Sequence, residues 1–170
     1  MELQVVNIKC SFFINKPLRI NERMKIINPY DNVKITIYNH SPNLINVTGI
    51  KSFEKLEIFK IYLSNQFSVN IIQERIDAIM LNYKSPIHKK INLNKLSNIC
   101  SNIKNYNLDF NCELFNAPFL KSKSKNGTLL LFSSGSVQIM GVKRKRDIPF
   151  YQIFLFFLFT KYKKLYKQDK

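Results

Sequence analysis

The sequence predicts an α+β fold in which two copies of one unit build a single curved antiparallel sheet, with helices packed on one of its faces. Three observations indicate this fold. A polar turn between two alternating apolar runs occurs twice, both copies end on Gly, an aliphatic residue and Lys, and a stretch of near-helical apolar spacing follows each copy. The copies are Val33–Lys51 and Gly127–Lys143, and 92 positions separate Gly49 from Gly141 and Lys51 from Lys143.

The first repeat, residues 1–70, is expected to begin with a strand over Leu3–Ile14 that ends before a turn at Pro17. The hairpin Val33–Lys51 follows, with its turn in the His-Ser-Pro-Asn sequence. Ser52–Gln66 then predicts an amphipathic helix, because apolar residues recur at near-helical spacing with Glu and Lys between them.

The second repeat, residues 71–170, has the same order and completes a single domain over residues 1–170. It opens with a strand over Arg75–Tyr83. Between Pro86 and Gly141 it has 23 more residues than the first repeat has between Pro17 and Gly49. We expect these to include a short helix, Asn92–Ile103, and an extra strand, Cys112–Lys121. After the hairpin, which turns at Ser-Ser-Gly, a second long helix is predicted from Asp147 onward, with Asp147 as its N-cap.

The chain carries a strong positive charge that has two explanations. Its 27 Lys and Arg residues against 11 Asp and Glu give a formal net charge of +16, which attracts polyanions such as nucleic acid or an anionic membrane. Only five of the basic residues are Arg, however, and the dominant residues Lys, Asn, Ile, Phe and Tyr have AT-rich codons. An AT-rich genome would produce the same bias, so the placement of the cations has to decide.

Signatures of other classes of protein are missing from the sequence. The start carries Glu2 and has no signal-peptide pattern, which favours an intracellular protein. The three cysteines form no CxxC pair, so neither a zinc site nor any other cofactor is expected. There is no phosphate-binding glycine loop and no nucleophile motif. We therefore expect neither an enzyme nor a small-molecule substrate.

The second hairpin resembles the TATA-box-binding protein family. Leu114-Phe115 opens one strand and Leu129–Phe132 closes the next, so that 17 positions separate Phe115 from Phe132. This is the spacing at which the family places its two intercalating phenylalanines in a repeat, and the Gly-Val-Lys at 141–143 resembles the family's Thr-Gly-Ala-Lys. In the first repeat, Asn7-Ile8 and Val47–Lys51 resemble the opening strand and the end of the hairpin.

The resemblance implies a saddle of two pseudo-symmetric repeats whose concave sheet binds the minor groove of AT-rich DNA, while the helices cover the convex face. Phenylalanine wedges would unstack base steps and bend the DNA, which is easiest at flexible TA-type steps. The family's DNA-contacting positions correspond here to Asn7, Tyr38, Thr48, Lys51, Phe115, Lys121, Leu130, Phe132, Gln138, Met140 and Lys143.

The first repeat departs from the family pattern. Tyr38 replaces the wedge phenylalanine nearest the hairpin turn, and no residue fills the other wedge position. Concave positions that are usually small and apolar correspond to Asn46, Gln138 and Met140. These departures predict an asymmetric DNA binder, or one that contacts promoters only beside partners.

The C-terminal segment admits three interpretations. A basic run, Lys143–Arg146, precedes the apolar stretch Ile148–Phe159, and more lysines follow. The apolar stretch is too short for a bilayer, which takes ~20 residues. It is the core helix of the repeat with an exposed apolar side for a partner protein, an interfacial membrane anchor, or a divergent tail.

The sequence as a whole predicts a TATA-binding-like transcription initiation factor of an AT-rich genome, such as that of a large DNA virus. Its expected partners are AT-rich double-stranded DNA, a TFIIB-like factor and RNA polymerase components, in the nucleus or at a cytoplasmic viral transcription site. The alternatives are a protein-interaction module that has lost specific DNA binding and, less favoured, a basic membrane-associated protein.

Overall fold

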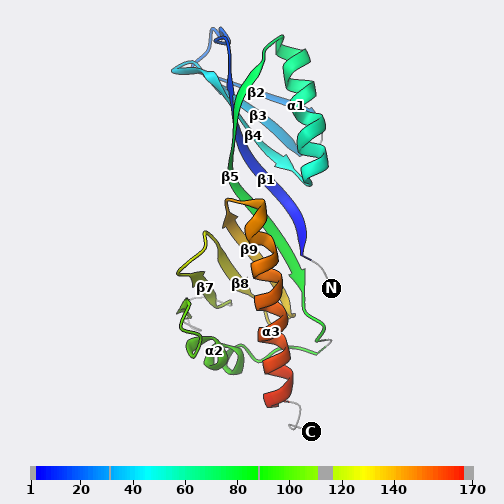
Figure 1. Cartoon of the computed structure of the whole chain (residues 1–170), viewed down its shortest axis with the longest axis vertical. Helices are drawn as coiled ribbons and strands as arrows, with labels where there is room; N and C mark the ends of the chain where they lie inside the picture. The colour runs from blue at the N-terminus through cyan, green and yellow to red at the C-terminus, as the bar shows by residue number, and fades with distance from the viewer. Residues whose placement is uncertain (1–2, 31, 88, 111–116, 167–170) are drawn as a thin grey trace. The chain divides into compact units, whose positions relative to one another are not determined.

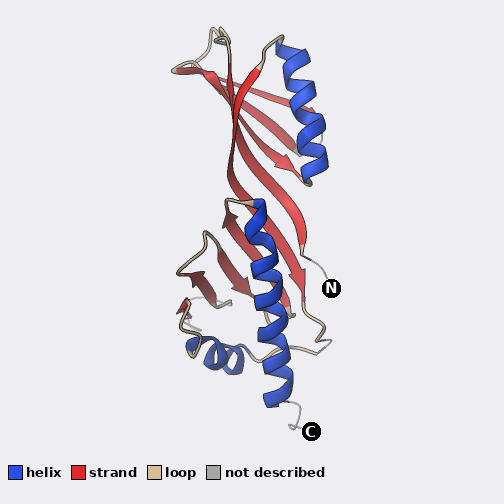
Figure 2. Ribbon diagram, viewed as in Figure 1, coloured by secondary structure: helices blue, strands red, loops and turns tan. Residues whose placement is uncertain are grey.

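The computed structural model describes residues 3–30, 32–87, 89–110 and 117–166. It divides into two compact units, one comprising Val5–Ile79 and the other Met80–Lys170 together with Met1–Gln4. We call them the N-terminal unit and the C-terminal unit. Each consists of antiparallel strands with a helix layer on one face (Figures 1 and 2). The predicted α+β class is thereby confirmed. The division falls within a strand, after the repeat boundary expected at residues 70 and 71.

In the N-terminal unit the strands follow the order β2-β3-β4-β1-β5. The long first strand buries Ile8, Cys10, Phe12 and Ile14, which alternate along it. Helix α1 packs Leu56, Phe59 and Leu63 into the core. The elements are β1 (Gln4–Ile14), β2 (Met24–Tyr30), β3 (Val33–Tyr38), β4 (Ser41–Ile50), α1 (Phe53–Phe67) and the first part of β5 (Ile71–Lys84).

In the C-terminal unit the order is β5-β9-β8-β7-β6. Helix α3 buries six side chains, including Tyr151 and Phe159, while α2 buries Leu96, Ile99 and Cys100. The elements are the second part of β5, α2 (Leu93–Ser101), β6 (Tyr106–Asp109), β7 (Phe119–Ser122), β8 (Thr128–Leu131), β9 (Ser136–Val142), a 3-10 turn (Lys145–Asp147) and α3 (Ile148–Tyr166).

Polar side chains begin the two shorter helices as their sequences require. The Ser52 hydroxyl accepts the backbone N–H of Lys55, and the Asn92 side chain accepts that of Lys95. Asp147 directly precedes α3, where a helix start was predicted, but its carboxylate is buried and pairs with two cations. Asp147 therefore forms a buried ion pair with Arg144 and Lys125, in place of the N-cap role that the sequence predicted.

Some elements differ from the expectation. The strands β2 and β6 were not predicted from the sequence. The first hairpin turns at Asn39 and His40, so that of the expected His-Ser-Pro-Asn turn only His40 lies in it and β4 begins at Ser41. Of the extra strand expected over Cys112–Lys121, the structure describes β7, and positions 112–116 lie outside the described residues. In α1, Ile58 and Ile61 are exposed although they were read as part of its apolar spacing.

Candidate nucleic-acid interface

Each unit has one sheet face covered by helices and one open face. Because side chains alternate along a strand, the residues between the buried ones form the open face, and residues directly opposite each other on neighbouring strands share it. In β8 and β9, Leu129, Leu131, Val137 and Ile139 are buried. The intervening side chains therefore define the open face of the C-terminal unit.

Two cross-strand rows form that face. The first joins Phe119, Leu130 and Gln138 through the pairing of β7, β8 and β9, and the Gln138 amide reaches the sulfur of Met80 at 3.5 Å. The second joins Lys121, Thr128 and Met140. The structure thus brings four residues predicted to contact DNA together on one face: Lys121, Leu130, Gln138 and Met140.

Phe132 lies at the edge of this face, immediately after β8. Its backbone N–H donates to the carbonyl of Ser136, and its carbonyl accepts from Gly135, so a tight turn holds the residue. The ring is 37% exposed, which is unusual for a phenylalanine so close to a core strand. It lines a hollow of about 430 Å³ with Asn82, Lys84 and Gln138 among its walls. Phe115, the second predicted wedge, lies outside the described residues.

The open face of the N-terminal unit carries a polar row. Ile26, Thr36, Asn46 and Ser11 are directly opposite one another across β2, β3, β4 and β1, and Ser11 bonds to Asp77 on β5. Beside this row, the Asn7 side chain lies 3.4 Å from the Thr48 hydroxyl and accepts the Gly49 N–H at 2.8 Å.

Tyr38 is on the same open face, in register with Met24, and its ring lies 5.2 Å from that of His40. Asn7 and Thr48 thus lie in contact with each other, and Tyr38 lies on the same face at the hairpin-turn end of β3.

The two repeated lysines are placed differently from the other predicted residues. Lys51 follows β4 and lines a cavity of about 350 Å³ beside α1, together with Lys55 and Phe59. It is not gathered with the open-face residues. Lys143 occupies the matching point after β9, where it is exposed.

Sequence reasoning missed several open-face residues. Phe119 and Met80 in the C-terminal unit, and Ser11, Arg75 and Asp77 in the N-terminal unit, were not selected. Strand register places Ser11 and Phe119 on this face, whereas side-chain contacts link Met80, Arg75 and Asp77 to it, and both are tertiary properties. The alternation of apolar and polar residues over Ile8–Phe12 is the one local signal for Ser11.

The strongest pKa shifts in the described residues belong to buried core groups. Burial raises the pKa of the Cys10 and Cys100 thiols to about 12. Burial, with a smaller effect of Asp147, also raises the pKa of Tyr151 to about 12. Desolvation by apolar neighbours is the main cause, so these shifts belong to the packed core rather than to a reactive cluster.

The described residues contain no candidate metal site and no candidate membrane-spanning helix. No group of three or more His, Cys, Asp or Glu side chains there is placed to hold a metal ion. None of the described helices, α3 included, has the length and apolar character needed to cross a bilayer.

Comparison with known proteins agrees with the fold and with the second hairpin. Residues 75–150 match the family model of "Transcription factor TFIID (or TATA-binding protein, TBP)". Among solved structures, the TBP of Methanococcus jannaschii matches with a TM-score of 0.66 at 20% identity, covering 95% of this chain and 99% of that one. Fold and family model define the class: an α+β protein with the TBP fold. The chain thus has the TBP fold and is similar to this family over residues 75–150.

Two further comparisons add nothing to this assignment. The structure of A. aeolicus tRNASec in complex with M. kandleri SerRS matches at 8% identity over 94% of this chain and 30% of that one, but its TM-score of 0.44 carries no weight. A search of curated protein sequences finds no match.

Proposed function

We propose that this chain is a DNA-binding transcription initiation factor that contacts the minor groove of AT-rich promoter DNA with the open face of its sheet. One observation carries the proposal. The C-terminal unit presents the row of Phe119, Leu130 and Gln138, the exposed Phe132 directly after β8, and Lys121 in the neighbouring row, all on the face opposite its helices. A minor groove offers this surface a narrow floor of base edges, with the adenine N3 and thymine O2 acceptors, between two lines of phosphates.

Phe132 supplies the wedge in this proposal. An aromatic ring inserted between base steps unstacks them and kinks the duplex toward the major groove, and the distortion is smallest at flexible TA-type steps. The preference for AT-rich sites then arises from deformability and from the A·T pattern of the minor groove. Leu130, Gln138 and Met140 lie beside the wedge and pack along the groove.

The two units contribute unequally to this mechanism. Tyr38, beside His40, occupies the place where the first repeat would carry its wedge, and the row across that unit is polar. We infer that the C-terminal unit produces most of the bend. A TFIIB-like factor and RNA polymerase components would then complete promoter recognition, in the nucleus or at a cytoplasmic viral transcription site.

The direct test follows binding and bending together. Fluorescence anisotropy reports affinity for AT-rich and GC-rich duplexes, and end-to-end energy transfer reports the bend. We expect tighter binding to the AT-rich duplex with a bend, and Phe132→Ala should abolish most of the bend and weaken binding on the order of tenfold. Phe115→Ala examines the second wedge. Equal binding to both duplexes without a bend would contradict the proposal.

Phe157→Ala is the matched control. It removes an exposed phenylalanine of similar accessibility from α3, on the helix side of the same unit. Binding and bending should both survive this change, so a loss confined to Phe132→Ala separates the wedge from a general loss of apolar surface.

One observation favours a second function, docking of a partner protein on α3. Ile153 and Phe156 are each 70% exposed and Phe157 is 53% exposed, on adjacent turns of one helix. Cationic residues precede and follow this patch, which suits a partner segment with apolar anchors and acidic flanks. The same surface would suit an anionic membrane.

A double variant separates these possibilities. Phe156→Ser with Phe157→Ser should leave DNA bending intact and abolish the further mobility shift caused by a purified TFIIB-like factor on the same duplex. Vesicle flotation on anionic lipid, lost in the same variant, would favour the membrane interpretation. An unchanged supershift would exclude this patch as the docking surface.

A further inference from the structure

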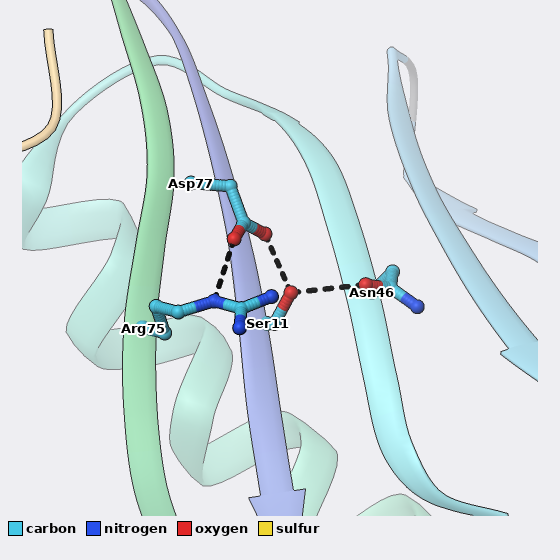
Figure 3. A network of polar contacts seen from close by, with 4 residues as sticks. All are labelled: Ser11, Asn46, Arg75 and Asp77. Carbon is cyan, nitrogen blue, oxygen red and sulfur yellow. Dashed lines mark hydrogen bonds and ion pairs between the residues drawn. The ribbon is translucent and has the colours of Figure 1, made fainter. Parts of the chain in front are cut away.

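The open face of the N-terminal unit has a charged cluster at its centre. Ser11, Asn46, Arg75 and Asp77 come from three neighbouring strands, β1, β4 and β5, and form one chain of polar contacts (Figure 3). The Ser11 oxygen lies 2.5 Å from one Asp77 carboxylate oxygen and 2.9 Å from the Asn46 side-chain oxygen. Arg75 Nε donates to the other Asp77 oxygen at 2.8 Å.

Burial and several mutual contacts hold the side chains of this cluster in place. Ser11 is fully buried, so its hydroxyl has exchanged water for these partners. A hydroxyl has one proton, and the carboxylate is its stronger acceptor. The Arg75 guanidinium is further positioned over the Phe13 ring, 5.8 Å from its centroid. Asp77 is therefore held in place from two sides, with its charge balanced by Arg75.

The corresponding place in the C-terminal unit has no charge. There the amide of Gln138 contacts the thioether of Met80, whereas Asn46 contacts Ser11 and, through it, Asp77. Gln138 and Asn46 are 92 positions apart and occupy equivalent points of the two hairpins. The two halves of the molecule thus present different chemistry at equivalent rows.

Asp77 keeps acceptor capacity after these bonds. A carboxylate has about four lone-pair sites, and the cluster uses two of them. The side chain is 20% exposed, so part of it stays accessible beside these contacts. It donates nothing while ionised.

The minor groove distinguishes base pairs by one donor. Adenine N3 and thymine O2 are acceptors and oppose a carboxylate, whereas guanine adds its N2 amino group as a donor. We propose that Asp77 is a specificity-determining residue that selects a G·C pair at one position of an otherwise AT-rich site. This inference rests on the proposed minor-groove binding and goes beyond it, since it makes the two half-sites different in sequence.

Base analogues test the inference on the wild-type protein. In a duplex that binds, each position in turn is made G·C, inosine·C or 2,6-diaminopurine·T. Inosine lacks the N2 amino group and diaminopurine adds it to an A·T-like pair. At one position we expect G·C and diaminopurine·T to bind on the order of tenfold more tightly than inosine·C and A·T. Equal binding of all four at every position would overturn the inference.

A variant then assigns the preference to the residue. Asp77→Asn removes the charge and adds an amide donor that suits adenine N3 and thymine O2, so the preference for the amino group at that position should be lost. Glu57→Gln removes the same charge from the exposed surface of α1 and should leave it unchanged. A preference that survives Asp77→Asn overturns the role of Asp77. Failure to bind any duplex would overturn the proposed function itself, and is distinguishable from binding without amino-group discrimination.

Discussion

At the scale of single residues, Asp147 shows how this chain uses a buried charge. Its side chain is 2% exposed, and its two oxygens lie 2.8 Å from Arg144 Nε and 3.2 Å from Lys125 Nζ. Burial alone would raise the pKa of the carboxyl, but the hydrogen bonds from Arg144 and Lys125 hold it below the ordinary value of 3.8. The ion pair ties the start of α3 to the loop before β8.

Replacing this carboxylate should destabilise the fold. We expect Asp147→Asn to lower the free energy of unfolding by about 1–2 kcal/mol, the lower end for a charged hydrogen-bonded group because both cations stay partly solvated. Since the pKa is lower in the folded state, the contribution is present above pH 3.8 and is lost as the pH falls through that lower value. Urea denaturation at several pH values measures it.

Asp109→Asn is the control for that experiment. Asp109 is exposed on β6, so its loss should leave the unfolding free energy within experimental error. A similar loss in both variants would contradict the role given to the buried pair.

At the scale of elements, the repeated glycines explain why both hairpins end alike. Gly49 and Gly141 have φ values of +98° and +79°. In a regular strand every second residue is buried, but around each glycine the buried residues are three positions apart. They are Val47 and Ile50 around Gly49, and Ile139 and Val142 around Gly141. The glycine therefore shifts the side-chain alternation by one residue and points the following aliphatic side chain into the core.

The two glycines should differ in their tolerance of a side chain. A Cβ on Gly141 meets nothing within 4 Å, so Gly141→Ala should cost only the backbone strain of about 1 kcal/mol. A Cβ on Gly49 would collide with the Asn32 carbonyl and lie 3.0 Å from Val33 Cα. We expect Gly49→Ala to lower the unfolding free energy by roughly 2–4 kcal/mol. Equal thermal shifts of the two variants would refute this explanation.

At the scale of the whole molecule, the charge is informative through its placement. The +16 total is compatible with codon bias, and several cations already serve the fold: Lys60 pairs with Glu57 and Glu74. Lys121 differs from these, because it is exposed on the open face in register with Thr128 and Met140. In the proposed DNA complex, a cation there would meet a phosphate beside the groove.

The salt dependence of binding should therefore separate placed cations from surplus ones. We expect Lys121→Ala to weaken binding to AT-rich and GC-rich duplexes alike and to reduce the slope of log K against log salt by about one. Lys55→Ala, in the first turn of α1, removes the same charge and should leave the slope unchanged. Anisotropy titrations at several salt concentrations measure both, and equal slopes for the two variants would assign the effect to net charge.

Much of the fold was predictable because short-range sequence patterns indicate its elements. Alternation indicated the strands of both hairpins, near-helical spacing indicated α1 and α3, and the duplicated Gly-aliphatic-Lys indicated two related units. The strands β2 and β6 were missed. The first contains Pro29 and the second has four residues, so neither shows the regular alternation that identifies a strand.

The candidate interface was predictable only in part. Leu130, Gln138 and Met140 were selected through the resemblance to the TATA-box-binding protein family, and the structure places them on one face because they alternate with buried neighbours in β8 and β9. By itself, then, the sequence determined the two repeats, their hairpins and the residues that alternate within them. Only the tertiary structure decided that Ser11, Asn46 and Asp77 meet, since hydrogen-bond register between distant strands selects which side chains share a face.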